Sequence, residues 1–250
     1  MNTVIYYFSA TGNCLTTARL LAQELGDCRL VPVASARKLP RIVEDAEAVG
    51  FVFPVYYGDM PYPVREMISK MVLRSDAYIF ILTTYRGHAG EVAKRTDQLL
   101  KTRGQKLSLA LGIHMPGNSF LNEPQVDQAY LEQQQEAVKG LVHSIKDKET
   151  QDYAEAGVLP LTPVSYPNNF RGILAEDSCI GCGTCVKVCP MDNITLVNGK
   201  AQIGDCCATC LACFHWCPVE AIYMSKQENI ARRRKYHHPD VTLQDIVSQK

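Results

Sequence analysis

Residues 4–14 read VIYYFSATGNC, and this stretch decides the fold of the first half of the chain. Residues 4–8 are all β-branched or aromatic, which is typical of a strand buried on both faces. A short polar loop follows, and an apolar helical pattern then runs up to Gly26, a residue type that commonly ends helices. The members of that pattern are Leu15, Ala18, Leu21, Ala22 and Leu25. The stretch therefore predicts a strand, a tight loop and a helix.

The same alternation continues to about residue 150. Apolar segments suited to strands occupy residues 28–33, 48–53, 77–83 and 107–113, and helical patterns occupy residues 64–71, 90–101 and 122–148. Strands that are apolar on both faces and alternate with helices indicate a parallel sheet covered on both sides. Ligands of such α/β sheets bind beyond the carboxyl ends of the strands, where the polar loop at residues 9–14 is expected to lie.

Cysteine dominates the second half of the chain, because nine of the eleven cysteines fall between Cys179 and Cys217. Residues 179–190 read CIGCGTCVKVCP and residues 207–218 read CATCLACFHWCP. Both runs follow C-x2-C-x2-C-x3-C-P, the bacterial ferredoxin spacing for 4Fe-4S clusters. A pair of structural zinc sites is the alternative, but zinc sites usually pair two C-x-x-C knuckles without the repeated C-P ending.

Residues 171–225 resemble a two-cluster bacterial ferredoxin. The resemblance implies that one 4Fe-4S cluster is bound by Cys179, Cys182, Cys185 and Cys217, and the other by Cys207, Cys210, Cys213 and Cys189. Cys206 falls outside the spacing and is not expected to be a ligand. Residues 194–203 predict a hairpin around Asn198-Gly199, and residues 221–224 are expected to pair with the segment near Ile173 and Leu174.

The loop at residues 9–14 has two interpretations. Thr11 or Asn13 caps the following helix, or the helix start binds a phosphate through its free N–H groups and its positive dipole end. The loop resembles the FMN-phosphate loop of flavodoxins, which implies a five-stranded parallel sheet in the order 2-1-3-4-5. Cys14 stands where many flavodoxins have a hydroxyl residue, and we expect it to be a buried, inert thiol.

The flavodoxin resemblance also places the flavin ring between the loops that follow the third and fourth strands. Tyr56, Tyr57 and Tyr85 either stack on the ring or are ordinary surface residues, and N–H groups near Gly58 and Gly87 are expected to face the ring edge. The implied FMN contacts are Ser9, Thr11, Gly12, Asn13, Cys14, Pro54, Val55, Tyr56, Tyr57, Gly58, Thr83, Thr84, Tyr85 and Gly87. Asn118 is expected to close over this site, and the sequence assigns it no chemical role.

The whole chain resembles the fused flavodoxin–ferredoxin proteins of anaerobic bacteria and archaea. The expected domains are residues 1–155 for the flavodoxin-like FMN domain and 171–225 for the two-cluster ferredoxin domain. A proline-containing linker over residues 156–170 joins them, and a basic C-terminal tail covers residues 226–250, with a solvated basic face over residues 231–238.

This organisation predicts electron transfer between two 4Fe-4S clusters and FMN, coupling one-electron and two-electron steps with redox protein partners. The alternative is an FMN-dependent reductase of a small molecule that is fed by its own ferredoxin domain. No catalytic acid–base pair or nucleophile stands out. Lys plus Arg and Asp plus Glu balance at 26 each, which argues against nucleic acid as a partner. Without a signal-peptide core or an apolar run of membrane-spanning length, a cytoplasmic location is expected.

Overall fold

The computed structural model describes residues 1–120, 122–154, 171–227 and 234–250. A five-stranded parallel sheet forms the N-terminal half, in the order β2-β1-β4-β6-β7. Its strands are β1 (Thr3–Tyr7), β2 (Cys28–Pro32), β4 (Ala48–Pro54), β6 (Tyr78–Tyr85) and β7 (Leu109–His114). Two short strands, β3 (Ile42–Glu44) and β5 (Met71–Leu73), pair in parallel outside this sheet. Counted without β3 and β5, the order is 2-1-3-4-5, so the predicted topology is confirmed.

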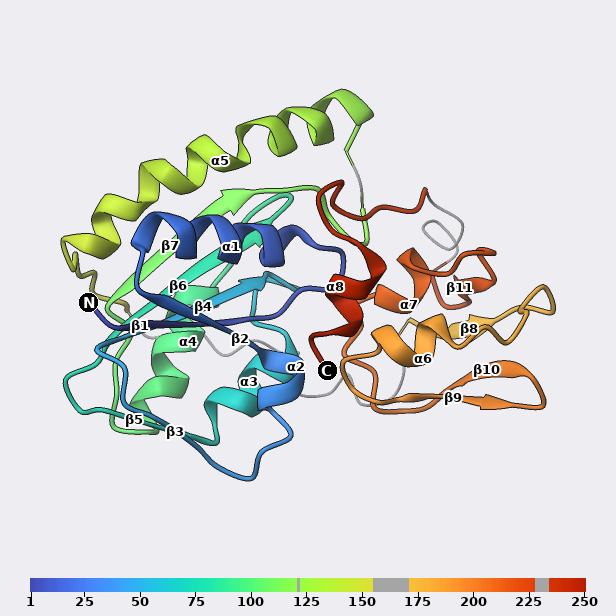
Figure 1. The fold of residues 1–250 in the computed structure, drawn as a ribbon, viewed down its shortest axis with the longest axis horizontal. Helices are drawn as coiled ribbons and strands as arrows, with labels where there is room; N and C mark the ends of the chain where they lie inside the picture. Colours follow the sequence, from blue (N-terminus) through green and yellow to red (C-terminus); the bar gives the residue numbers. More distant parts are fainter. Residues whose placement is uncertain (121, 155–170, 228–233) are drawn as a thin grey trace.

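Helices cover both faces of the sheet (Figure 1). On one face lie α1 (Asn13–Leu25) and α5 (Pro124–Lys146), and on the other lie α3 (Tyr62–Ile68) and α4 (Val92–Lys101), with the short α2 (Val33–Ala36) beside α3. Gly26 ends α1 with a φ of 87°, and its N–H donates to the carbonyl of Ala22. The helix predicted over residues 64–71 ends at Ile68, because Met71 already belongs to β5.

The sheet core explains why the central strands β1, β4 and β6 are buried along almost their whole length. Phe51 and Phe53 of β4 and Phe80 of β6 are all fully buried. Gly50 makes room for one of these rings, since a Cβ at this position would stand 2.3 Å from Cζ of Phe80. Because helices cover both faces of the sheet, a ligand can reach it only at the ends of the strands, and in parallel sheets the loops at the carboxyl ends bind ligands.

The C-terminal half is built on two antiparallel pairs. It contains β8 (Ile173–Ala175), α6 (Thr184–Val188), β9 (Ile194–Val197), β10 (Lys200–Ile203), α7 (Ala212–His215) and β11 (Ile222–Met224). The β9–β10 hairpin turns at Asn198 and Gly199, both of which have positive φ. Strand β11 pairs with β8, placing Met224 opposite Ile173. Both pairings confirm the predictions for this half.

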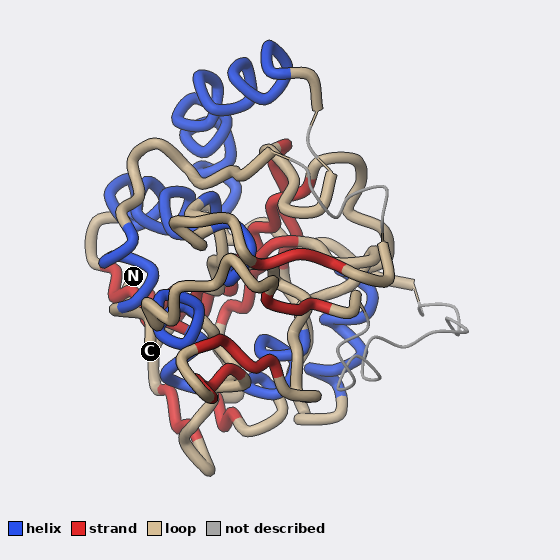
Figure 2. The backbone as a smooth tube through the Cα atoms, turned by 90° about the vertical axis from the view of Figure 1, so that its right-hand side faces the viewer, coloured by secondary structure: helices blue, strands red, loops and turns tan. Residues whose placement is uncertain are grey.

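The C-terminal half lies against the carboxyl end of the parallel sheet in Figure 1, and Figure 2 views the molecule from the side of this half. The indole N–H of Trp216 donates to the carbonyl of Ala10 at 2.9 Å, directly beside the predicted phosphate loop. The last helix, α8 (Leu243–Val247), lies between the two halves, and its Asp245 pairs with Arg19 of α1. The two halves therefore share a packed interface.

The described part of the predicted basic face is only partly solvated. Tyr236 and His238 are buried, with 9% and 2% of their surfaces exposed, whereas Arg234 and His237 are exposed. Arg234 pairs with Asp127 of α5, and the ammonium of Lys235 lies 3.2 Å from the centre of the Phe214 ring. The expectation of a solvated face is therefore wrong for Tyr236 and His238, because these side chains pack in the seam between the halves. Residues 231–233 lie outside the described residues.

The predicted linker at residues 156–170 also lies outside the described residues, so the domain boundaries stay a prediction. Among the helices within the described ranges, none combines the length and apolarity that crossing a bilayer requires.

Candidate functional site

A cavity of about 570 Å³ lies at the carboxyl edge of the sheet, a size within the usual range for small-molecule sites. This main cavity is walled by the loops after β1, β4, β6 and β7, and by Arg171 and Thr209 of the C-terminal half. All the predicted FMN contacts line it except two, Gly12 and Thr83. Thr83 instead turns its hydroxyl to the carbonyl of Leu111, at 3.2 Å. Residues from four loops thus meet where a ligand of this sheet is expected.

The loop after β1 offers donors rather than a side-chain helix cap. Gly12 is the N-cap of α1, with a φ of 106°, and no side chain caps the helix. Of the two interpretations of this loop, capping by Thr11 or Asn13 is therefore wrong. The N–H of Gly12 donates to Oγ of Ser9 at 3.2 Å, which leaves the Ser9 proton available to a ligand. Ser9, Thr11 and the first turn of α1 together suit a phosphate.

Gly12 and Asn13 tie this loop to the C-terminal tail. A Cβ on Gly12 would stand 2.7 Å from Cβ of His238, so the tail packs directly behind the loop. The N–H of His238 donates to the carbonyl of Thr11 at 2.7 Å. The Asn13 carboxamide donates to the carbonyl of Pro116 at 2.8 Å and accepts from the Tyr236 hydroxyl at 2.5 Å. The Asn13 side chain therefore braces the loop, with both its polar atoms engaged by protein groups.

Cys14 is 2% exposed, and its sulfur lies 3.2 Å from Oγ1 of Thr84. Burial raises the pKa of the Cys14 thiol to about 12, against a smaller opposing effect of the Thr84 hydrogen bond. The thiol is therefore protonated at neutral pH, and a protonated thiol is a poor nucleophile. The expected burial of Cys14 is confirmed, and its inertness stays a prediction.

The loops after β4 and β6 hold each other in place. Tyr57 has a φ of 55° and Gly58 one of 75°. A Cβ on Gly90 would stand 2.4 Å from Cα of Gly58, and the N–H of Glu91 donates to the carbonyl of Gly58 at 3.0 Å. Tyr85 meets the ring of His114 edge-on, with centroids 4.8 Å apart. The tyrosines therefore have protein partners and also line the main cavity.

The eight cysteines of the two runs form two sets. Cys179, Cys182, Cys185 and Cys217 line one small cavity and form the first cysteine set. Cys189, Cys207, Cys210 and Cys213 line another and form the second cysteine set. Each set thus draws its fourth member from the other run, as the ferredoxin resemblance implies. Cys206 lines neither cavity and is exposed.

Comparison with known proteins fits this geometry. Residues 4–135, more than half of the chain, match the family model described as a flavodoxin domain. The chain belongs to the flavodoxin domain family. Residues 173–195 match the family model of the 4Fe-4S binding domain. The N-terminal half is thus a flavodoxin domain and the C-terminal half a 4Fe-4S ferredoxin domain, and both are electron-transfer modules that imply a flavin and iron–sulfur chemistry.

Curated relatives match the ferredoxin domain. A ferredoxin of Pyrobaculum islandicum is 41% identical over 54 residues, which cover 21% of this chain and 50% of that protein. Pyruvate synthase subunit PorD of Methanocaldococcus jannaschii is 39% identical over 61 residues, covering 24% of this chain and 71% of that protein. The chain therefore spans only half the length of the first of these relatives.

Among solved structures, a putative flavoprotein of Bacteroides uniformis is 16% identical with a TM-score of 0.38, over 51% of this chain and 96% of that one. Rubredoxin oxygen:oxidoreductase of Desulfovibrio gigas is 18% identical with a TM-score of 0.37, over 58% of this chain and 36% of that one.

Asn118, in the flavodoxin domain, connects the two domains. Its Nδ2 donates to the Tyr56 hydroxyl at 3.0 Å and to the carbonyl of Cys210 at 2.9 Å. His215 holds the backbone of Asn118. The N–H of Tyr236 donates to Nδ1 of His215, so Nδ1 is an acceptor and the ring proton is on Nε2. Nε2–H then donates to the carbonyl of Asn118 at 2.8 Å. The sequence placed Asn118 near the flavin site, but its partner lies 92 residues away, and no local pattern shows that contact.

Backbone N–H groups point at the cysteine sulfurs. The N–H of Ala221 lies 3.3 Å from Sγ of Cys217, that of Asn193 lies 3.4 Å from Cys189, and that of Thr209 lies 3.3 Å from Cys207. Such N–H···S contacts are among the features that set the reduction potential of iron–sulfur sites. Within the described residues, no three His, Cys, Asp or Glu side chains converge on a point for a single metal ion. The four cysteines of each set instead line one shared small cavity.

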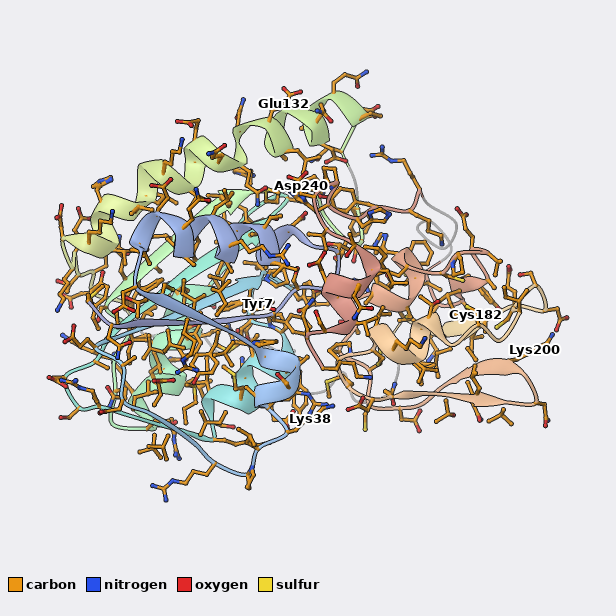
Figure 3. All side chains as sticks on the ribbon, viewed as in Figure 1. Tyr7, Lys38, Glu132, Cys182, Lys200 and Asp240 are labelled. Carbon is orange, nitrogen blue, oxygen red and sulfur yellow. The ribbon has the colours of Figure 1, made fainter. Side chains whose placement is uncertain are left out.

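The second cysteine set is the one beside the main cavity. Thr209, whose N–H faces Cys207, also lines the main cavity, and Asn118 reaches Cys210 from its wall. Burial raises the pKa of the Cys210 thiol, and the nearby Cys189 raises it further. Thiolates here therefore need a compensating cation, which iron supplies. In the first set Cys182 is exposed and lies well out from the sheet (Figure 3).

Proposed function

We propose that this chain transfers electrons between an FMN in the main cavity and two 4Fe-4S clusters, and so couples one-electron to two-electron redox steps. When bound, each cluster exchanges one electron and the flavin one or two. The ferredoxin-type cysteine sets would hold the clusters. Ser9, Thr11 and the start of α1 would hold the FMN phosphate, and the loops at Tyr56 and Gly87 would hold the ring.

The bridge through Asn118 is the observation that carries this proposal. One side chain donates both to Tyr56, in the wall of the main cavity, and to the carbonyl of Cys210, in the second cysteine set. Because Asn118 is itself held by His215, the cysteine loop and the cavity wall keep a fixed separation. Fixed, short separations through bonded and hydrogen-bonded atoms favour electron transfer between two centres over exchange with solvent.

The two cysteine sets support different roles. The second set is buried against the main cavity, so it suits exchange with the flavin. The first set has an exposed Cys182, and the neighbouring Ile180 is 64% exposed. A set at the surface suits exchange with a separate redox protein. Under this proposal electrons pass from a protein partner to the first set, then the second set, then the flavin, or in reverse.

Two cysteine variants test the order of these steps. Anaerobically prepared protein should contain about eight iron atoms from two four-iron clusters and one FMN. Cys182→Ala should lose about half of the iron, keep FMN, and still exchange electrons between the remaining cluster and the flavin. Cys210→Ala should also lose about half of the iron and keep FMN, but this exchange should be lost.

Rapid reduction with a one-electron donor, followed by flavin absorbance and low-temperature electron paramagnetic resonance, makes the comparison. Retained FMN in both variants is the control for a folded flavodoxin domain. Fast flavin–cluster exchange in Cys210→Ala and none in Cys182→Ala would contradict the proposed order. Flavin reoxidation by one particular small molecule, and by no redox protein, would favour the reductase alternative instead.

A further inference from the structure

Arg171 brings a positive charge from the ferredoxin domain to the wall of the main cavity. It is 4% exposed. One of its terminal nitrogens donates to Oε1 of Gln227 at 2.6 Å, and the other donates to the Tyr57 hydroxyl. Its guanidinium carbon lies 5.4 Å from the centre of the Tyr57 ring. Arg171 is thus held by neutral partners at the boundary between the two domains.

This buried charge has no carboxylate partner among the residues that the structure describes. No ion pair of Arg171 occurs within those ranges, and its Nε is buried there without a hydrogen-bond acceptor. A buried cation without a counter-charge is strongly unfavourable, and proteins usually place an anion beside it. The Arg171 guanidinium therefore needs a negative counter-charge from a group other than the Asp and Glu side chains that the structure describes.

Both candidate sources of negative charge lie next to Arg171. Arg171 shares the wall of the main cavity with Thr209, whose N–H lies 3.3 Å from Sγ of Cys207 in the second cysteine set. Its contact with the Tyr57 hydroxyl places the same guanidinium against the loop after β4, which also lines the main cavity. The positive charge of Arg171 therefore borders both the main cavity and the loop of the second cysteine set. The charged Arg86 also lines the main cavity, and it comes from the flavodoxin domain.

We infer that Arg171 is the shared counter-charge of the two cofactors: it stabilises the electron added to the flavin and the electron added to the cluster on the second cysteine set. This inference rests on the proposed function, because both cofactors must be present. Each reduction adds one negative charge near the guanidinium, so Arg171 raises the reduction potential of both centres. The cluster on the first cysteine set, bordered by the exposed Cys182, is outside its influence.

Equilibrium redox titration of the holoprotein tests this inference, with dithionite as reductant, mediator dyes and spectroscopic readout of each centre. In Arg171→Gln the reduced-to-oxidised ratio at a fixed solution potential should fall about tenfold for the flavin and for the second-set cluster. For a one-electron step that ratio corresponds to about 59 mV. The first-set cluster should not shift.

Two further variants complete the design. Arg74→Gln removes the same charge from an exposed ion pair with Asp76, near the start of β6 and so at the opposite edge of the sheet, and should leave all three centres unchanged. Arg171→Lys keeps the charge and should titrate within a few-fold of the native protein. Should Arg171→Gln lose a cofactor, Arg171→Lys decides: restored binding and titration support the inference, and a loss in both variants overturns it.

The outcomes distinguish a failure of the proposed function from a failure of the inference about Arg171. Native protein that binds no flavin or no clusters refutes the proposed function itself. Native protein that binds both, with Arg171→Gln titrating as Arg74→Gln does, refutes only the role of Arg171.

Discussion

Asn118→Ala removes the hydrogen-bonded bridge between the domains. The substitution deletes the two hydrogen bonds that Nδ2 donates, to Tyr56 and to the Cys210 carbonyl, and a 3.3 Å hydrogen bond that Oδ1 accepts from the adjacent Ser119. The accepting carbonyl of residue 118 stays in place. At a net 0.5–1.5 kcal/mol for each bond, loss of the two Nδ2 bonds should lower the free energy of unfolding by about 1–3 kcal/mol. For a protein of this size that corresponds to a melting temperature lower by about 2–12 °C. If the same free energy is lost from the docking of the Cys210 loop, the docked-to-separated ratio falls about 5–150-fold.

Asn122→Ala is the matched control, because it is the same substitution and deletes two side-chain hydrogen bonds. Its Nδ2 donates to Asp127 and its Oδ1 accepts from Arg86, so both bonds stay within the flavodoxin domain. Both variants should melt lower by similar amounts and keep FMN and iron. Only Asn118→Ala should show faster amide hydrogen exchange in residues 207–213 and slower electron exchange between the second-set cluster and the flavin. Equal electron-exchange rates in the two variants would refute the bridge.

Three other consequences can be measured on the same holoprotein. Gly12→Ala should lower the free energy of unfolding by at least about 1–2 kcal/mol, because alanine is strained at a φ of 106° and its Cβ would stand 2.7 Å from Cβ of His238. Thermal melting should show the lower stability, and FMN titration should show weaker binding. Iodoacetamide at neutral pH should label the exposed Cys206 and leave Cys14 unlabelled, since burial raises the pKa of Cys14 to about 12; mass spectrometry that finds Cys14 labelled first would contradict its inert role. Burial lowers the pKa of His238, and the charge of Asp240 opposes that shift. The folded protein therefore favours the neutral imidazole. This contribution to stability is fully present above the unfolded pKa of about 6.5, and it is lost as the pH falls below that pKa. The melting temperature should therefore drop between pH 7.5 and 5.5, and the drop should be smaller in His238→Gln.

Local patterns were sufficient to predict most of the fold. The central strands β1, β4 and β6 are buried on both faces, so their apolar runs reveal them directly, and the Asn198-Gly199 turn marks its hairpin. The ferredoxin resemblance of the two cysteine runs implied the same two groups of four cysteines that line the two small cavities, including the exchange of Cys189 and Cys217 between the runs. The three-residue strands β3 and β5 were missed, because segments so short carry too few residues for a period to be recognised.

The missed features depend on contacts between segments far apart in the chain. Gly12, rather than a side chain, caps α1, because the tail at His238 packs against the loop and fixes its backbone. The tail itself looked like a solvated basic run, since composition does not reveal that Tyr236 and His238 enter the domain seam. The contacts of Asn118 with Cys210 and of Arg171 with Tyr57 span 92 and 114 residues. Each arises from the docking of two domains, which no local pattern encodes.

The central claim is that a flavin and iron–sulfur clusters exchange electrons within one chain, and its most direct test is the dependence of that exchange on protein concentration. Anaerobic, cofactor-replete protein would be partly reduced by a brief light pulse with a photochemical donor, and the flavin absorbance would be followed over a tenfold range of protein concentration. The account predicts that flavin and cluster signals relax together at a rate that does not change with concentration. A rate that rises in proportion to concentration, or a flavin signal that never follows the cluster signal, would contradict it.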